Sequence, residues 1–135
     1  MNRVALHARA VVAVALARLL LRRHDTTWTL RRLAKPGRRG SRPLPTGSAL
    51  LAVQRAGRVL GAACLVQSVA LTALLTRSGA KPVLVLGCRR YEDRHWGAHA
   101  WVVSDGAIFE PVPADKHEEL AQLDAAHAWT PTPRG

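Results

Sequence analysis

The stretch CLVQSVALTALLTRSGAKPVLVLGCRRYEDRHWGAHAWVVSDGAIFE, residues 64–110, decides the fold of this 135-residue chain. Its first part, residues 64–78, carries aliphatic side chains at helical spacing and is followed by Gly79, a common helix stop. Residues 82–88 then form a short, continuous apolar run that is typical of a buried strand. A long helix that leads directly into strands predicts the α+β class.

Two further strands are predicted after this first one. Residues 98–103 are mostly apolar, Asp105-Gly106 is the signal of a tight two-residue turn, and residues 108–112 return as the partner strand. Together with the first strand they predict a small antiparallel sheet. Residues 114–128 are expected to form a last helix whose acidic side chains are exposed.

Charge is distributed unevenly along the chain, which carries a net charge of +11. Residues 1–58 contain thirteen Lys or Arg and only Asp25 as an acid, whereas residues 59–135 contain seven basic and eight acidic side chains. A basic segment of this kind suits nucleic acid, an anionic membrane or an acidic protein surface. Because no zinc finger, basic zipper or RNA-binding aromatic motif accompanies it, we expect a solvated or protein-facing patch and no nucleic-acid partner.

The composition excludes several classes of protein. Apolar residues make up 48% of the chain and charged residues 21%, which excludes a wholly disordered chain. The length allows one domain with a single core. Two cysteines are too few for a disulfide scaffold and fit free thiols in a reducing compartment, so we expect a cytoplasmic protein.

Residues 4–21 are predominantly apolar and predict an amphipathic helix. Its residues at helical spacing are Leu6, Arg9, Ala10, Ala13, Leu16 and Leu20. Arginines interrupt this stretch and its longest uninterrupted apolar run has eight residues, so we expect neither a spanning helix nor a signal peptide. The preferred interpretation is a helix that packs on the main domain or on a partner. The alternative is a helix that lies on an anionic membrane surface.

Three local signals organise the chain after this helix. Asp25 is a predicted N-cap for a short helix, and the Gly-, Pro- and Arg-rich residues 35–48 predict an exposed linker. Ser48 is expected to cap a helix over residues 49–60.

Cys64 is the candidate nucleophile. It is predicted to begin a helix, where unpaired backbone N–H groups and the helix dipole stabilise a thiolate. A thiolate beside a base is an activated nucleophile. The alternative for this cysteine is a buried hydrophobic role.

The predicted hairpin places an acid beside His99. The two-residue turn pairs Trp101 with Glu110, so Glu110 lies diagonally opposite His99 on the same face of the sheet. A glutamate side chain can span that diagonal distance of roughly 7–8 Å between backbones, whereas Asp105, at the turn, is roughly 20 Å from His99. Glu110 is therefore the expected third member of a Cys-His-acid triad, and a one-residue register slip would overturn this choice.

Cys88, His95 and His99 superficially resemble a metal-binding set. Two histidines four residues apart face the same way only on a helix, and Gly97 with the following strand argues against a helix here. We therefore expect no metal. Trp101, two residues from His99, is expected to form a wall of the core or of a substrate cleft.

The region from about Val53 to Pro111 contains five motifs: Cys64-Leu65, the apolar helix through Leu74-Leu75, Arg77-Ser78-Gly79-Ala80, Leu84-Val85-Leu86-Gly87-Cys88-Arg89 and Ala98-His99-Ala100-Trp101-Val102. With these motifs the chain resembles the transglutaminase-like cysteine protease of lasso peptide biosynthesis. The His-Ala-Trp-Val step with a following Asp-Gly turn is the most specific part, and the basic, Leu-rich amino-terminal helix also suits that family.

The resemblance implies a papain-like or transglutaminase-like core, with the catalytic cysteine at a helix N-terminus packed on a small antiparallel sheet. It implies removal of the leader from a ribosomally made lasso peptide precursor, without a cofactor. Cys64 would be the nucleophile, His99 the general base and acid, and Glu110 the orienting carboxylate, with Asp105 as the other acid under consideration. The Cys64 N–H would be one oxyanion donor, and Gln54 is a weaker candidate for a second.

The resemblance also implies partners. They are the precursor peptide, a separate winged-helix protein that recognises the leader, and the cyclase that receives the core peptide; peripheral membrane contact through the amino-terminal helix is a further expectation. A fused recognition module is not expected, because the first 48 residues show no strand-rich pattern. The predicted parts are a basic helical extension with its linker, a protease core and a flexible tail: 1–47, 48–128 and 129–135.

Two other functions are compatible with the same residues. One is a basic, non-catalytic adaptor that binds nucleic acid or an anionic membrane. The other is an acyltransferase that uses the same triad but passes the acyl group to an amine instead of water.

Overall fold

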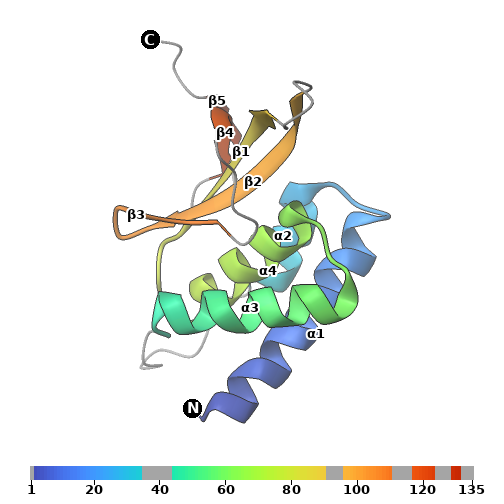
Figure 1. The fold of residues 1–135 in the computed structure, drawn as a ribbon, viewed down its shortest axis with the longest axis vertical. Coiled ribbons are helices and arrows are strands. Elements are labelled where there is room, and N and C mark those ends of the chain that lie inside the picture. The colour runs from blue at the N-terminus through green and yellow to red at the C-terminus, as the bar shows by residue number, and fades with distance from the viewer. Residues whose placement is uncertain (1, 35–43, 91–95, 111–116, 124–128, 132–135) are drawn as a thin grey trace.

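The computed structural model describes residues 2–34, 44–90, 96–110, 117–123 and 129–131, whose elements lie in two layers (Figure 1). In chain order the elements of these residues are α1 (Arg3–Leu21), α2 (Thr26–Leu33), α3 (Thr46–Leu60), α4 (Cys64–Arg77), β1 (Val83–Arg90), β2 (Trp96–Ser104), β3 (Ala107–Phe109), β4 (His117–Leu123) and β5 (Trp129–Pro131). The helices gather on one side and the strands on the other, which confirms the predicted α+β class.

The central element is α4, which lies between the sheet and the other helices. Residues 67–75 are all buried, and α4 contacts β1 and β2 as well as α1, α2 and α3. A helix that is apolar all round is stable only inside a core, which explains this position. The predicted stop is confirmed, because Gly79 has a φ of 96° and the Ala80 N–H donates to the Leu75 carbonyl at 3.1 Å.

The strands form one antiparallel sheet in the order β3-β2-β1-β4-β5. Leu84, Val102 and Leu123 from its three middle strands belong to the same core as the helices. The predicted hairpin is confirmed: β2 pairs with β3 across a turn in which both central residues, Asp105 and Gly106, have positive φ. This backbone conformation matches the twist of the two strands.

The predicted helix over residues 114–128 is wrong where the structure describes it, because residues 117–123 form strand β4. This strand pairs with β1, and Leu123 enters the core opposite Leu84. The backbone N–H and C=O groups at the free edge of the apolar strand β1 need hydrogen-bonding partners. Pairing with β1 therefore outweighs the local helix preference of residues 117–123. The remainder of that prediction lies outside the described residues.

The helix predicted to start after Ser48 begins earlier, at Thr46. Pro45 is its N-cap residue and no side-chain hydrogen bond caps this end, so Ser48 lies inside the first turn. A proline near the start of a helix costs no hydrogen bond and has a suitable φ, which explains the earlier start. The Asp25 cap is confirmed, because its Oδ1 accepts from the Trp28 N–H at 2.7 Å.

The buried face of α1 includes most of the predicted one. Leu6 and Ala10 are buried, and Ala13 and Leu20 are packed against the core. Leu16, also predicted on this face, is instead 42% exposed. Because α1 has apolar residues on nearly every side, periodicity did not define the edge of the face that packs. The helix contacts α3 and α4, so the structure agrees with the packing interpretation, and α1 and α2 share one core with the elements after residue 48.

Candidate functional site

Cys64 is the first residue of α4, as predicted, and its thiol is free and half-buried. The N-cap residue Ala63 provides no side-chain hydrogen bond, and the first turn contains no acidic residue. The first backbone N–H groups of the helix therefore have no capping side chain among the described residues. Such groups, with the helix dipole, favour an anion beside Cys64.

A buried glutamine fixes the connection that leads into Cys64. The Gln67 Nε2 donates to the Ala62 carbonyl at 2.8 Å, and the Gln67 side chain lies directly over Gly57 of α3. A Cβ at Gly57 would lie only 2.3 Å from the Gln67 Cδ, so this packing requires a glycine. The sequence analysis missed both residues; a glycine inside an otherwise regular helix was the available signal.

His99 and Glu110 come together as the hairpin register predicts. Val102 pairs with Phe109, which places Glu110 on the diagonal from His99, and the His99 Nε2 lies 3.8 Å from the Glu110 Oε1. The imidazole is fully buried and the carboxylate side chain is 17% exposed. The separation is within ion-pair distance but longer than a hydrogen bond, and catalytic contacts are often long in the absence of substrate.

The His99 ring is held by an aromatic neighbour over a glycine. Its centroid lies 5.3 Å from that of buried Trp101, with the planes tilted by 32°. Gly87 is the β1 partner of His99, and a Cβ there would lie 2.7 Å from the Trp101 Cη2 and 2.2 Å from the Glu118 carbonyl oxygen. Gly87 therefore makes room for the Trp101 ring, a role that the sequence analysis did not assign.

The other predicted site residues have different positions. Asp105 is exposed at the tip of the β2–β3 turn, and Gln54 is half-buried on α3. Cys88 is a half-buried free thiol on β1, and His95 lies outside the described residues. Of the two acids considered, Glu110 is thus the one that approaches His99.

Helix α4 begins at Cys64 and packs on β2, the strand that carries His99. Figure 1 shows β2 passing over α4. Along β2, His99 alternates with the core residue Val102, so the imidazole and Glu110 lie on the other face of the strand from Val102. The described side chains thus supply a thiol at an open helix end and a buried imidazole with a carboxylate beside it.

The model of the transglutaminase-like superfamily matches residues 9–125, which is most of the chain. No curated protein and no solved structure matches the chain.

Proposed function

The chain belongs to the transglutaminase-like superfamily, and we propose that it is a cysteine peptidase that removes the leader from a lasso peptide precursor. The observation that carries the proposal is the approach of the Glu110 carboxylate to the buried His99 ring, with 3.8 Å between Oε1 and Nε2. His99 lies on β2, which packs against α4, the helix that Cys64 begins. A nucleophile, a base and an orienting acid are the three groups that acyl transfer from an amide requires.

The proposed reaction has two stages. The Cys64 thiolate attacks the carbonyl carbon of the last leader residue, and the C–N bond breaks as the imidazolium of His99 protonates the departing amine. The core peptide leaves with a free amino terminus and the leader remains as a thioester. His99 then takes a proton from water, whose oxygen attacks the thioester, and the leader leaves with a free carboxylate while Cys64 is restored.

Charge that develops during these steps needs fixed partners. The open first turn of α4 offers backbone N–H groups, including that of Cys64, to the oxyanion of each tetrahedral intermediate. The Glu110 carboxylate stabilises the imidazolium and selects the orientation of the ring. Trp101 restrains the same ring from the side.

The choice of a lasso precursor as substrate is supported by the sequence motifs around Cys64 and His99, above all the Ala98-His99-Ala100-Trp101-Val102 step. The proposal includes a separate winged-helix protein that presents the leader and a cyclase that takes the released core peptide. A free amine on the core peptide is the group that a ring-closing enzyme would use, so close association of the two enzymes is part of the proposal.

The first experiment is mass spectrometry of a precursor peptide encoded near this protein, incubated with the protein and any small recognition protein encoded beside it. We expect a leader and a core peptide whose masses sum to the precursor plus one water. Cys64→Ala should abolish both products, while Cys88→Ala, the matched control at the second free thiol, should retain them. Products that lack the added water would indicate transfer to an amine instead. An intact precursor with the folded parent protein and its partner would contradict the proposal.

A second measurement tests whether the thiol and the imidazole meet. Nucleophilic catalysis requires Cys64 Sγ to come within hydrogen-bond distance of the His99 ring. We therefore expect His99→Gln to slow alkylation of Cys64 by iodoacetamide and to leave alkylation of Cys88 unchanged, as read by peptide mass spectrometry of each site. Equal rates at Cys64 in the two proteins would show that the residues do not work as a pair.

A further inference from the structure

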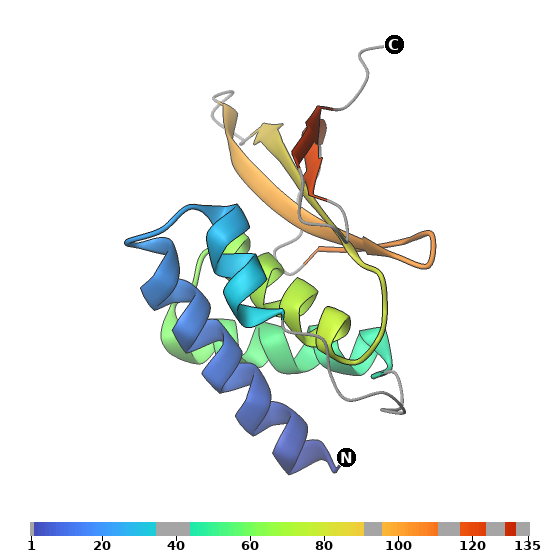
Figure 2. The same ribbon diagram turned by 180° about the vertical axis from the view of Figure 1, so that it is seen from behind.

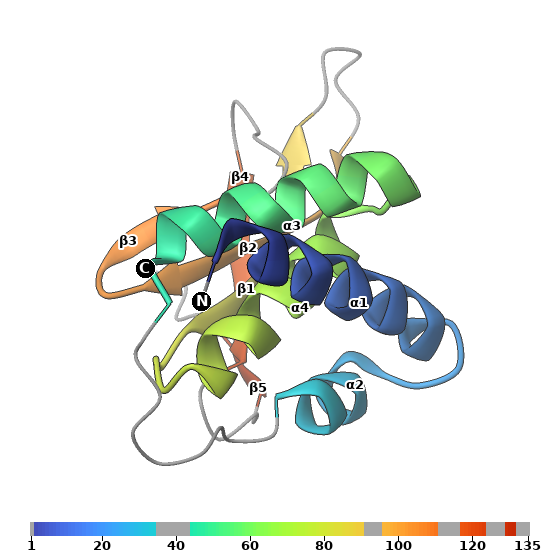
Figure 3. The same ribbon diagram turned by 90° about the horizontal axis from the view of Figure 1, so that it is seen from below.

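The outward face of α1 is apolar along its whole length, although this helix lies at the surface. Figure 2 and Figure 3 show α1 on the side of the helical layer that is remote from the sheet. The large side chains exposed on this face are all aliphatic; they are Val4, Val11, Val12, Leu16 and Leu19. We call these five residues the outer stripe. At a rise of about 1.5 Å per residue the helix is about 28 Å long, so the stripe is a continuous ridge.

The outer stripe is bordered by arginines. Arg9 and Arg77 lie on the α4 side, where they help to line a groove of about 320 Å³ together with Val12, Leu16 and Leu74. On the opposite side of α1, Arg55 from α3 lies 3.2 Å from the His7 ring, and Arg18 donates to the Leu60 carbonyl. Apart from Asp25, the first acidic residue in the sequence is Glu92, so no acid other than Asp25 lies on any of the helices or their caps.

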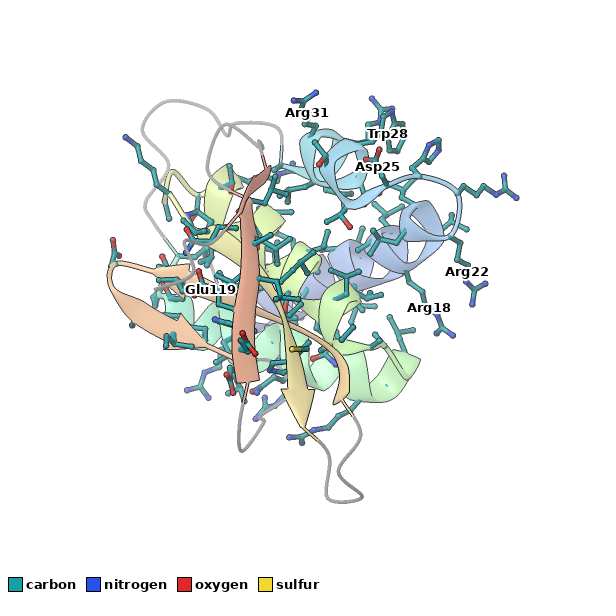
Figure 4. The ribbon with its side chains drawn as sticks, turned by 90° about the horizontal axis from the view of Figure 1, so that it is seen from above. Arg18, Arg22, Asp25, Trp28, Arg31 and Glu119 are labelled. Atoms are coloured by element: carbon teal, nitrogen blue, oxygen red, sulfur yellow. The ribbon has the colours of Figure 1, made fainter. Side chains whose placement is uncertain are left out.

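The end of the stripe near α2 carries an aromatic group among further arginines. Trp28 is 42% exposed and stacks on His24 with their centroids 3.6 Å apart. Figure 4 shows Arg31 and Asp25 near Trp28 at α2, with Arg22 and Arg18 farther away, beside α1. Tryptophan and arginine at one end of an apolar helix are the groups that concentrate at the interface between lipid headgroups and acyl chains.

We propose that the outer stripe and the α1–α2 corner form a docking surface for an anionic lipid bilayer. The stripe enters the acyl boundary, the groove between α1 and α4 accepts an acyl chain, and the arginines contact the lipid phosphates. Charge complementarity selects this occupant, because the described charged side chains that border the stripe are arginines and Asp25 is the one acid at the α1–α2 corner. The inference does not depend on the proposed peptidase activity.

The length and composition of α1 agree with contact with lipid. By these two criteria alone it is long and apolar enough to cross a membrane, with a mean hydropathy of 1.9 over an 18-residue window. A core helix or a signal sequence meets the same criterion, and four residues of the inner face are packed in this core. In the proposal α1 therefore lies along the membrane surface and stays attached to α3 and α4.

Sedimentation with large unilamellar vesicles tests the proposal with the full chain. One set contains phosphatidylcholine with phosphatidylglycerol and the other phosphatidylcholine alone, each at low and high salt. We expect binding to the anionic vesicles that weakens with salt, and much weaker binding to the neutral ones. The double variant Leu16→Glu/Leu19→Glu should lower the partition coefficient by roughly tenfold or more. Arg22→Gln/Arg23→Gln should lower it by about fivefold per arginine.

The control is Ile108→Glu, which adds one negative charge, against two in the double variant, to a side chain that is 60% exposed but lies on β3, in the sheet layer. It should bind as the parent protein does, and far-ultraviolet circular dichroism checks that every variant is folded. Absence of binding to anionic vesicles would overturn the proposal and assign this surface to a protein partner. Unchanged binding of Leu16→Glu/Leu19→Glu, or an equal loss in Ile108→Glu, would also overturn it, because α1 would then not be the docking element.

Discussion

The helical layer and the sheet layer differ in the sign of the charge they carry. The four helices have no acidic residue, and Asp25, which caps α2, is the only acid in the first 91 residues. The other eight acids follow residue 91, where the described ones belong to β4 or to the β2–β3 hairpin and its end. The layer that presents Cys64 therefore favours anions, whereas the layer that holds His99 favours cations.

This division matches the charges that the proposed reaction develops. In the proposed reaction a thiolate and an oxyanion would form at the start of α4, at its uncapped N–H groups. An imidazolium would form on β2, beside Glu110. Each layer thus stabilises the charge that its own residue acquires, and variants in the two layers should have separable effects.

The largest of these effects is expected at Glu110. Glu110→Gln keeps the shape of the side chain but removes the charge that stabilises the His99 imidazolium, so kcat/KM for precursor cleavage should fall by roughly 100-fold to 10,000-fold. Asp105→Asn removes the same charge from the exposed turn and should leave kcat/KM close to that of the parent protein. Steady-state cleavage rates measure both. Equal losses, or a larger loss at Asp105, would show that Glu110 is not the orienting acid. The argument from the hairpin register would then be wrong as well.

A smaller effect, on stability first, is expected at Gly87. In Gly87→Ala the new Cβ would meet the Glu118 carbonyl oxygen and the Trp101 ring, so β4 or the indole must move, at a cost of about 1–3 kcal/mol in the free energy of unfolding. Gly47→Ala is the matched control, because nothing lies within 4 Å of its Cβ and it is in the first turn of α3. That change should stabilise the protein by about 0.5–1 kcal/mol.

Urea unfolding measures the stability of both glycine variants, and the cleavage rate shows whether the movement reaches His99. We expect Gly87→Ala to lose activity under conditions where it is still folded, since Trp101 restrains the imidazole. If Gly87→Ala were as stable and as active as the parent protein, Gly87 would not be needed to make room for Trp101, and Trp101 would not position His99.

The sequence predicted those parts of the fold that are determined locally. The α4 helix and its stop at Gly79 follow from aliphatic periodicity and a glycine, and the approach of Glu110 to His99 follows from a turn type that fixes the hairpin register. These inferences needed contacts between residues that are close in the chain. The assignment of Cys64, His99 and Glu110 as a working triad stays a prediction until the experiments above are done.

The features that were missed depend on contacts between elements far apart in sequence or on packing at one face. Strand β4 exists because β1 needs a second neighbour, which the residues of β4 do not reveal on their own. The prediction for α1 misplaced Leu16, because both faces of that helix are apolar and its packing on α3 and α4 sets the edge of the buried face. The places where Gly57 and Gly87 accept Gln67 and Trp101 are likewise visible only after the elements meet.

The smallest effect is expected at Asp25, the one acid of the helical layer. Asp25→Ala removes the acceptor for the Trp28 N–H and should cost about 1 kcal/mol in the free energy of unfolding, which corresponds to about 4 °C in Tm. Asp25→Asn retains a capping oxygen and should be nearly as stable as the parent protein. Because it also removes the negative charge beside Arg22 and Arg31, it should bind anionic vesicles more tightly, whereas its cleavage rate should not change. Scanning calorimetry measures the change in Tm, and vesicle sedimentation measures the change in membrane binding. If Asp25→Asn lost stability like Asp25→Ala, the charge and not the hydrogen bond would stabilise α2, and the corner would be held together by its electrostatics.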